Sequence, residues 1–186
     1  MILADGDYID KVAFDLTVNF ERMIGRRIPK ADFARWTDCV ALDGGIREGD
    51  NSTQVILIHD KRHTRMENFI PGEYDSELDG KAFQDNLGEF RISTVRTEEM
   101  ITGAELFVEA LEVLCASGSV RRLMVVPDAE KIYGQVRDTL RRADDERQRV
   151  TVFAMQPMPG GNFRQEILGY SLMSALGIKS DEIEQF

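Results

Sequence analysis

The sequence is poor in cysteine, with only two among its 186 residues. Cys39 and Cys115 lie far apart and lack a C-x-x-C spacing, so we expect neither a disulfide framework nor a zinc–thiolate site. Two buried thiols in a reducing compartment are the better interpretation, and the cytoplasm is the predicted location.

Positive charge is also in short supply. The chain has 23 Lys and Arg against 33 Asp and Glu, which gives a formal net charge of −10. Non-specific binding of nucleic acid depends on cationic side chains that displace counterions, so this balance disfavours RNA as a partner. A local basic patch is still compatible with RNA, and a protein partner or a homo-oligomer stays open.

Long apolar runs are absent as well. No stretch is long enough to span a bilayer, and Asp5 and Asp7 interrupt the apolar start of the chain, unlike a signal peptide. Hydrophobic residues make up 42% and charged residues 30%, which is typical of a soluble globular protein. We expect one domain over residues 1–178, an acidic tail over 179–186, and no membrane partner.

Short apolar strands alternate with segments whose apolar residues have helical spacing. Strands are predicted at 2–5, 55–58, 90–95, 123–126 and 150–155, and helices at 11–25, 29–45, 82–87, 101–115, 130–142 and 163–176. Residues 61–80 are polar and predict a long loop with a functional role. The alternation predicts a three-layer α/β/α fold with a mainly parallel sheet of about five strands.

Acidic residues gather where the predicted strands end and helices begin. They are Asp5, Asp7, Glu105, Asp128 and Glu130. Ligand sites in parallel sheets lie at the carboxyl ends of the strands, near the point where the strand order reverses. Carboxylates that meet there repel one another, which favours a divalent cation between them. We therefore expect one acidic site built from distant segments.

Phosphodiester hydrolysis is the chemistry that such a site suits, because a carboxylate-bound metal activates water and neutralises phosphate. Asp5, Glu105 and Asp128 are the candidate ligands of Mg or Mn. Asp7 and Glu130 are candidates for supporting these ligands or orienting the attacking water. The densest basic run, which also contains His63, is a candidate for steering or holding phosphates, with Lys61, Arg62 and Arg65 as its substrate-binding residues.

Each motif also has a purely structural interpretation. Thr102-x-x-Glu105 fits a helix capping box, Asp128 fits an N-cap, and Asp5-Gly6-Asp7 fits a turn. The basic run fits a solvated loop. His59 and His63 have the spacing of a helical metal pair, but a strand is predicted up to residue 58, so we do not expect them to share a face.

Three motifs resemble, in the same order, those of the NYN branch of the PIN-like superfamily. Asp5-Gly6-Asp7-Tyr8 is similar to that family's Asp-Gly-Asp/Glu-Asn at the end of the first strand. Thr102-Gly103-Ala104-Glu105 is similar to Lys-Gly-Val-Asp at a helix start. Pro127-Asp128-Ala129-Glu130 corresponds to Ser-Gly-Asp-x-Asp-Phe after a later strand, and the resemblance covers nearly the whole chain.

The resemblance implies a PIN-like, Rossmann-like topology and a Mg- or Mn-dependent endoribonuclease. The sequence departs from the family pattern where Tyr8 replaces Asn and Thr102 replaces Lys. Glu105 and Glu130 stand for Asp and add a methylene, which changes carboxylate placement around a metal. These departures and the net charge favour the alternative of a catalytically inactive PIN-like binding or assembly module. A small-molecule or nucleotide binder at the same edge is a third interpretation.

Overall fold

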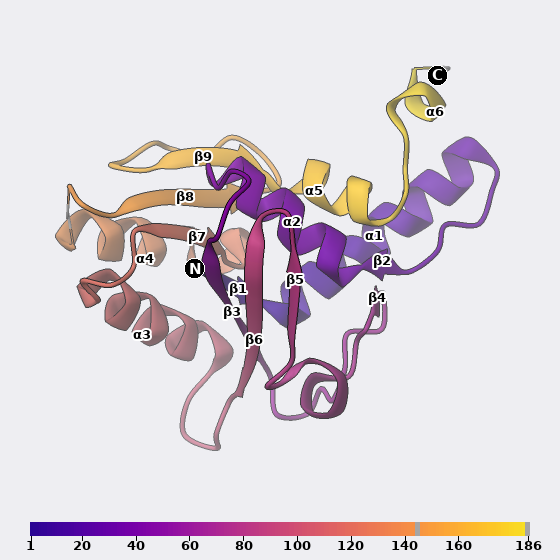
Figure 1. The fold of residues 1–186 in the computed structure, drawn as a ribbon. Coiled ribbons are helices and arrows are strands. Elements are labelled where there is room, and N and C mark those ends of the chain that lie inside the picture. The colour runs from indigo at the N-terminus through magenta and orange to yellow at the C-terminus, as the bar shows by residue number, and fades with distance from the viewer. Residues whose placement is uncertain (144–145, 185–186) are drawn as a thin grey trace.

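A mainly parallel sheet runs through the middle of the computed structural model, which describes residues 1–143 and 146–184 (Figure 1). In this part of the chain, seven strands form one sheet in the order β5-β6-β3-β1-β7-β8-β9. The strands are β1 (Ile2–Asp5), β3 (Ser52–His59), β5 (Ala82–Asp85), β6 (Gly88–Arg96), β7 (Arg122–Val126), β8 (Arg149–Ala154) and β9 (Arg164–Ile167). All neighbouring pairs are parallel except β5 with β6.

The strand order reverses between β1 and β7. From β1 the chain adds β3 and β6 on one side and then returns to add β7, β8 and β9 on the other. Ala4 of β1 pairs with Leu57 of β3 and with Val126 of β7, so the three central strands end close together. This is the arrangement of a doubly wound sheet, in which ligands bind at the carboxyl ends beside the reversal.

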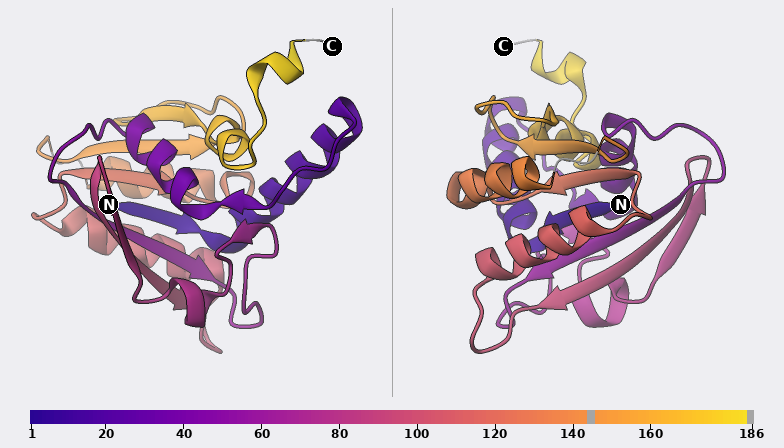
Figure 2. Two further views of the ribbon diagram at one scale, coloured as in Figure 1. Left: turned by 45° about the vertical axis from the view of Figure 1, so that its right-hand side comes forward. Right: turned by 90° about the vertical axis from the view of Figure 1, so that its left-hand side faces the viewer.

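Helices cover both faces of the sheet (Figure 2). One face carries α1 (Gly6–Ile24), α2 (Phe33–Asp43) and α5 (Leu168–Ala175), and the other carries α3 (Gly103–Ala116) and α4 (Ala129–Arg142). Ile2 and Ala4 of β1 pack into the core of the first face, whereas Leu3 packs into that of the second. The α/β class and the mainly parallel sheet are confirmed, with two strands more than the predicted five.

Edge strands replace one predicted helix and the first residues of another. Residues 82–85 of the predicted helix 82–87 form β5, which pairs with β6 and stacks Phe83 on Phe90 with ring centroids 4.8 Å apart. Residues 164–167 of the predicted helix 163–176 form β9, so α5 begins only at Leu168. In both segments hydrogen bonds to a neighbouring strand satisfy the backbone and override the local sequence preference.

Two further helices begin at capping residues rather than at the predicted positions. The helix predicted from residue 11 begins at Gly6, where Asp5 is the N-cap. The helix predicted from Pro29 begins at Phe33, where the side chain of Asp32 accepts a hydrogen bond from the Arg35 backbone nitrogen at 3.1 Å. In both cases an acidic side chain satisfies a free amide of the first turn.

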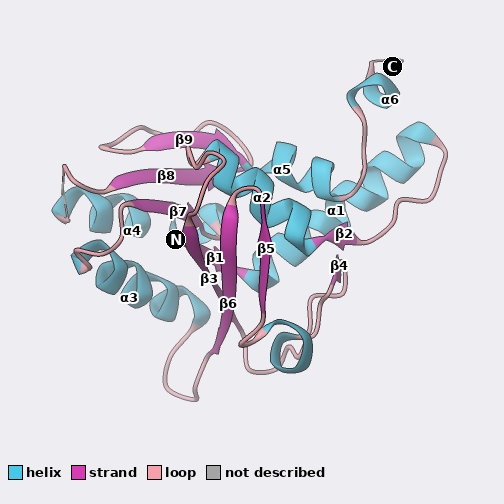
Figure 3. Ribbon diagram, viewed as in Figure 1, coloured by secondary structure: helices cyan, strands magenta, loops and turns pink. Residues whose placement is uncertain are grey.

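The long segment predicted as a loop, residues 61–80, is held against α1 by hydrogen bonds. It contains β4 (Phe69–Ile70), which pairs with β2 (Ala31–Asp32), and one π-helical turn at Tyr74–Leu78 (Figure 3). The Asp10 carboxylate accepts hydrogen bonds from the backbone nitrogens of Glu67 and Asn68 at 3.1 and 2.7 Å. Side-chain bonds of this kind hold a segment that has little regular structure of its own.

The predicted acidic tail begins with a short helix, α6 (Ser180–Ile183), and its residues 185–186 lie outside the described part. Glu182 of α6 forms an ion pair with Arg26, whose Nε lies 2.6 Å from the carboxylate. Among the described residues, no helix is both long enough and apolar enough to cross a bilayer.

Replacing Asp10 by Ala should weaken the attachment of this segment. The change leaves two backbone amides without their acceptor, so we expect a loss of about 1–2 kcal/mol in the free energy of unfolding. Urea denaturation measures this loss, and hydrogen exchange should show faster exchange at Glu67 and Asn68. Asp15→Ala is the matched control, since Asp15 is an exposed acid of the same helix. Equal losses in the two variants would contradict the assigned role of Asp10.

Candidate functional site

Asp5 and Asp128 lie at the carboxyl ends of the two strands between which the order reverses. Asp5 ends β1, and its Oδ1 accepts a hydrogen bond from the Tyr8 backbone nitrogen at 2.9 Å. Asp128 follows β7 and occupies the N-cap position of α4, but its side chain makes no capping hydrogen bond. Both line a cavity of about 470 Å³, together with Asp7 and Asp60, which we call the acidic cavity.

Two buried polar atoms of the acidic cavity have no hydrogen-bond partner among the described residues. They are Oδ1 of Asp128 and the hydroxyl of Tyr8, and these two residues are 9% and 3% exposed. The other carboxylate oxygen of Asp128, Oδ2, lies 3.1 Å from Nζ of Lys131. Because buried polar groups are nearly always paired, these two unpaired atoms are exceptional, and both belong to residues that line the acidic cavity.

Burial raises the pKa of Asp5 to about 6. The negative charges of Asp7 and Asp128 raise it further, whereas the Tyr8 amide and the Lys131 ammonium oppose the shift. The Asp5 carboxyl therefore resists ionisation next to a second carboxylate. A cation bound between the two would favour the ionised form of Asp5, so the pair is a suitable place for a cation.

Asp7 lines the same cavity, but both of its oxygens are already occupied. Oδ2 accepts a hydrogen bond from the Asp60 backbone nitrogen at 2.7 Å, and Oδ1 accepts one from the Tyr74 hydroxyl at 3.1 Å. Nδ1 of His63 lies 3.0 Å from the same Oδ2. This carboxylate raises the pKa of His63, chiefly through the hydrogen bond between them.

The Asp5-Gly6-Asp7 motif has a structural role at each position. Asp5 caps α1, and Asp7 holds Tyr74. A Cβ added to Gly6 would lie 2.6 Å from the Tyr74 hydroxyl, so only glycine leaves room for that side chain. The motif therefore anchors the loop segment while it places Asp5 in the acidic cavity, rather than forming the turn that its composition suggests.

Glu105 does not line the acidic cavity. Its carboxylate accepts hydrogen bonds from the Thr102 backbone nitrogen and hydroxyl at 2.9 and 2.8 Å, which confirms the capping box that the sequence suggested. It borders a separate hollow between α3 and α4. Of the α3 segment, Gly103 and Ala104 reach the acidic cavity instead.

Glu130 also lies outside the acidic cavity. It is exposed, with a carboxylate oxygen 3.7 Å from Nζ of Lys11. Of the five predicted acids, the structure therefore brings together Asp5, Asp7 and Asp128. Within residues 1–143 and 146–184, no group of three or more His, Cys, Asp or Glu residues is arranged to hold a metal ion.

Of the three predicted phosphate-binding residues, only Arg62 lines the acidic cavity. Its guanidinium donates to the Asp60 carboxylate at 2.9 and 2.8 Å and lowers the pKa of that group. Lys61 lies 3.7 Å from Glu99 instead. Arg65 forms ion pairs with acidic neighbours and lines an adjoining cavity that also contacts Arg62 and His63.

The contact of His63 with Asp7 is the feature of this site that the sequence did not reveal. His63 occupies a turn after β3, and its partner Asp7 comes from the start of α1. The two residues meet only when the loop segment folds onto α1, so the spacing of residues within the sequence does not predict the contact.

The raised pKa of Asp5 predicts a pH-dependent cost of folding. In its protonated form, the Asp5 carboxyl stabilises the folded state. This contribution is fully present below the pKa of the unfolded chain, near 4, and is lost as the pH rises through the folded-state pKa of about 6. Asp5→Asn keeps the capping oxygen and removes the charge, so we expect it to be more stable than the wild type at pH 7.5 by roughly 3 kcal/mol. Urea denaturation with a chelator present should show this difference shrinking toward pH 4. Parallel pH profiles for wild type and variant would contradict the assignment.

Comparison with known proteins places the chain in a single family. A family model matches residues 1–183, which is nearly the whole chain. No curated protein and no solved structure shows a significant match. The matched family is described as a family of unknown function, DUF6621. The doubly wound sheet and its acidic cavity are thus found in a chain that belongs to the DUF6621 family.

Proposed function

We propose that the chain is a PIN-like, metal-dependent endoribonuclease that hydrolyses phosphodiester bonds in the acidic cavity. The observation that carries this proposal is the buried, unpaired Oδ1 of Asp128 beside Asp5 at the reversal of strand order. Mg²⁺ is commonly held by one or two protein carboxylates, with water and substrate phosphate as its other ligands. A pair of carboxylates therefore fits Mg or Mn, and Glu105 is not required.

Four polar side chains of the cavity have direct roles in this proposal. Asp5 and Asp128 would hold the metal, which when bound supplies charge neutralisation and an activated water. The unpaired Tyr8 hydroxyl would donate a hydrogen bond to a phosphate oxygen. Lys131, with its ammonium next to Asp128, would add positive charge near the transferred phosphate.

His63 is the proposed general acid. Asp7 holds Nδ1 of the imidazole and raises the pKa of His63, which favours the protonated ring near neutral pH. Among the described residues, Nε2 has no hydrogen-bond partner, so it is free to give its proton to the leaving oxygen. Arg62, which is exposed and also lines the cavity, adds positive charge.

A catalytically inactive PIN-like binding or assembly module is the second candidate. The observation that favours it is the ion pair of Lys131 with Asp128, because an ammonium group there takes the place of a cation. The capping box occupies Glu105 as well, and the net charge of −10 opposes RNA binding. In this alternative the retained carboxylates serve the fold.

Manganese should distinguish the two candidates. If Asp5 and Asp128 hold the metal, Mn²⁺ should raise the melting temperature saturably, by a stabilisation of about 2.7 kcal/mol at 100 times the dissociation constant. The double variant Asp5→Asn with Asp128→Asn should lose this response and the cleavage of a single-stranded RNA. Glu130→Gln is the matched control, since it removes an exposed neighbouring carboxylate. A wild type with neither a response to Mn²⁺ nor RNA cleavage would favour the inactive module.

Replacing His63 by Ala should slow RNA cleavage without abolishing metal binding. General acids typically contribute about 10²- to 10⁴-fold to a rate, and we expect a loss in that range. The pH–rate profile should also lose the fall in rate at high pH that deprotonation of His63 causes. An unchanged rate and profile would remove His63 from the mechanism, while leaving the proposed metal site intact.

A further inference from the structure

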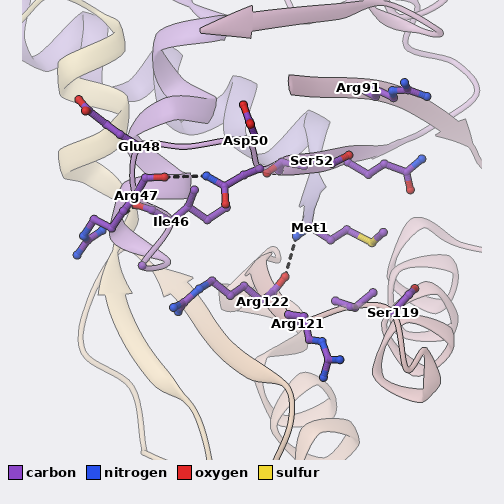
Figure 4. A pocket seen from close by; sticks show the side chains of 15 residues that line it. Met1, Ile46, Arg47, Glu48, Asp50, Ser52, Arg91, Ser119, Arg121 and Arg122 are labelled. Carbon is purple, nitrogen blue, oxygen red and sulfur yellow. Dashed lines mark hydrogen bonds between the residues drawn. The ribbon is translucent and has the colours of Figure 1, made fainter. Parts of the chain in front are cut away.

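A second cavity lies at the opposite edge of the sheet, where the parallel strands begin. It has a volume of about 820 Å³ and contacts Met1 before β1, Ser52 at the start of β3 and Arg122 at the start of β7 (Figure 4). It is therefore separate from the acidic cavity, which lies at the carboxyl ends of the same strands. Its size is within the range of small-molecule sites, about 300–1,000 Å³.

Four arginines line this cavity, which we call the arginine cavity. They are Arg47, Arg91, Arg121 and Arg122, and Figure 4 shows them distributed around Met1. Arg91 is paired with Glu89 at 3.0 Å, but the other three form no ion pair with a carboxylate among the described residues. Glu48 and Asp50 are the acids that line it.

This gathering of unpaired positive charge is unusual in a chain with ten more acidic than basic residues. Like charges that share one hollow repel one another, and a bound anion removes that repulsion. Arginine is also the side chain best suited to phosphate, because its planar group offers two parallel N–H donors.

Two of these arginines are held in place by the backbone. Nη1 of Arg47 donates to the carbonyl oxygens of Leu42 and Ile46 at 3.0 and 2.8 Å. Nη1 of Arg122 lies 3.5 Å from the carbonyl oxygen of Gly44. These bonds satisfy carbonyls at the end of α2 and use one nitrogen of each guanidinium. The remaining N–H donors of both side chains stay available, and the hydrogen bonds of Arg47 already hold its guanidinium in position.

Gly45 leaves the space that Arg122 occupies. Its φ of +89° favours glycine, and an added Cβ would lie 2.7 Å from Nη1 of Arg122. Capping of α2 accounts for Arg47 and Arg122 but not for Arg121. Arg121 is exposed, and its side chain makes no hydrogen bond or ion pair within the described residues.

We propose that the arginine cavity binds a small anion that carries two or more phosphate groups. The arginines come from separate segments of the chain, and Figure 4 shows the side chains of Arg47, Arg91 and Arg121 lying apart from one another, which favours an anion with several charged groups over a single phosphate. A long nucleic acid is disfavoured here, because the net charge of −10 repels an extended polyanion. A compact oligophosphate, free or as part of a nucleotide, fits both the hollow and its charge.

Titration calorimetry and thermal unfolding with inorganic tripolyphosphate test this proposal, in the presence of a chelator. We expect saturable binding to the wild type and a rise in melting temperature beyond that caused by sodium sulfate at equal ionic strength. Arg121→Gln with Arg122→Gln should weaken binding at least about tenfold. Arg121→Gln alone should also weaken it, which keeps the test valid if the double variant misfolds.

Two control variants distinguish binding in the arginine cavity from binding elsewhere on the protein. Arg22→Gln removes an exposed arginine near the end of α1 and should bind as the wild type does. Asp128→Asn should also bind normally, so failure of the acidic cavity as a nuclease site would leave this result unchanged. Tighter binding of adenosine triphosphate than of tripolyphosphate would assign a nucleotide, and equal binding an oligophosphate alone. No saturable binding, or equal affinity of the wild type and the Arg121 and Arg122 variants, would overturn the proposal.

Discussion

The direct junction of β1 and α1 at Asp5 is the constraint on which the acidic edge depends. Asp5 is at once the last residue of the strand and the N-cap of the helix, so no loop intervenes. Its carboxylate is thereby fixed at the reversal of strand order, next to the segment that follows β7. The same junction places Asp7 in the first turn of α1, where it holds Tyr74 and the backbone of Asp60.

Part of the negative charge of the chain is engaged with backbone amides. Asp10 holds the segment at Glu67, and Glu105 caps α3. Glu77 accepts from the backbone nitrogens of two successive residues, Gly72 and Glu73, at 3.0 Å each. An acidic composition therefore does not by itself indicate an acidic binding site. The acids that carry a functional argument are those whose oxygens are buried and unpaired, above all Asp128.

The central strands were predictable from the sequence because they are buried on both faces and read as continuous apolar runs. Leu123 to Val126 is an example, with every residue buried. The edge strands were not predictable, since residues such as Gln84 and Arg164 are polar and take their conformation from pairing. Within the site, Asp5 and Asp128 followed from the strand ends. Glu105 was misplaced because a capping box and a metal ligand share one sequence pattern, and the contact of His63 with Asp7 depends on the fold of a long segment.

The two edge strands of the sheet, β5 and β9, are poor templates for pairing with a strand of another chain. β5 and β9 are each four residues long, and β9 presents Arg164 and Glu166, which pair with one another at 3.2 Å. Short, charged outer strands discourage another polypeptide from adding its own backbone hydrogen bonds. Self-association by continuous β-pairing, the route to fibrils and to many two-fold dimers, is thus disfavoured at both edges of this sheet.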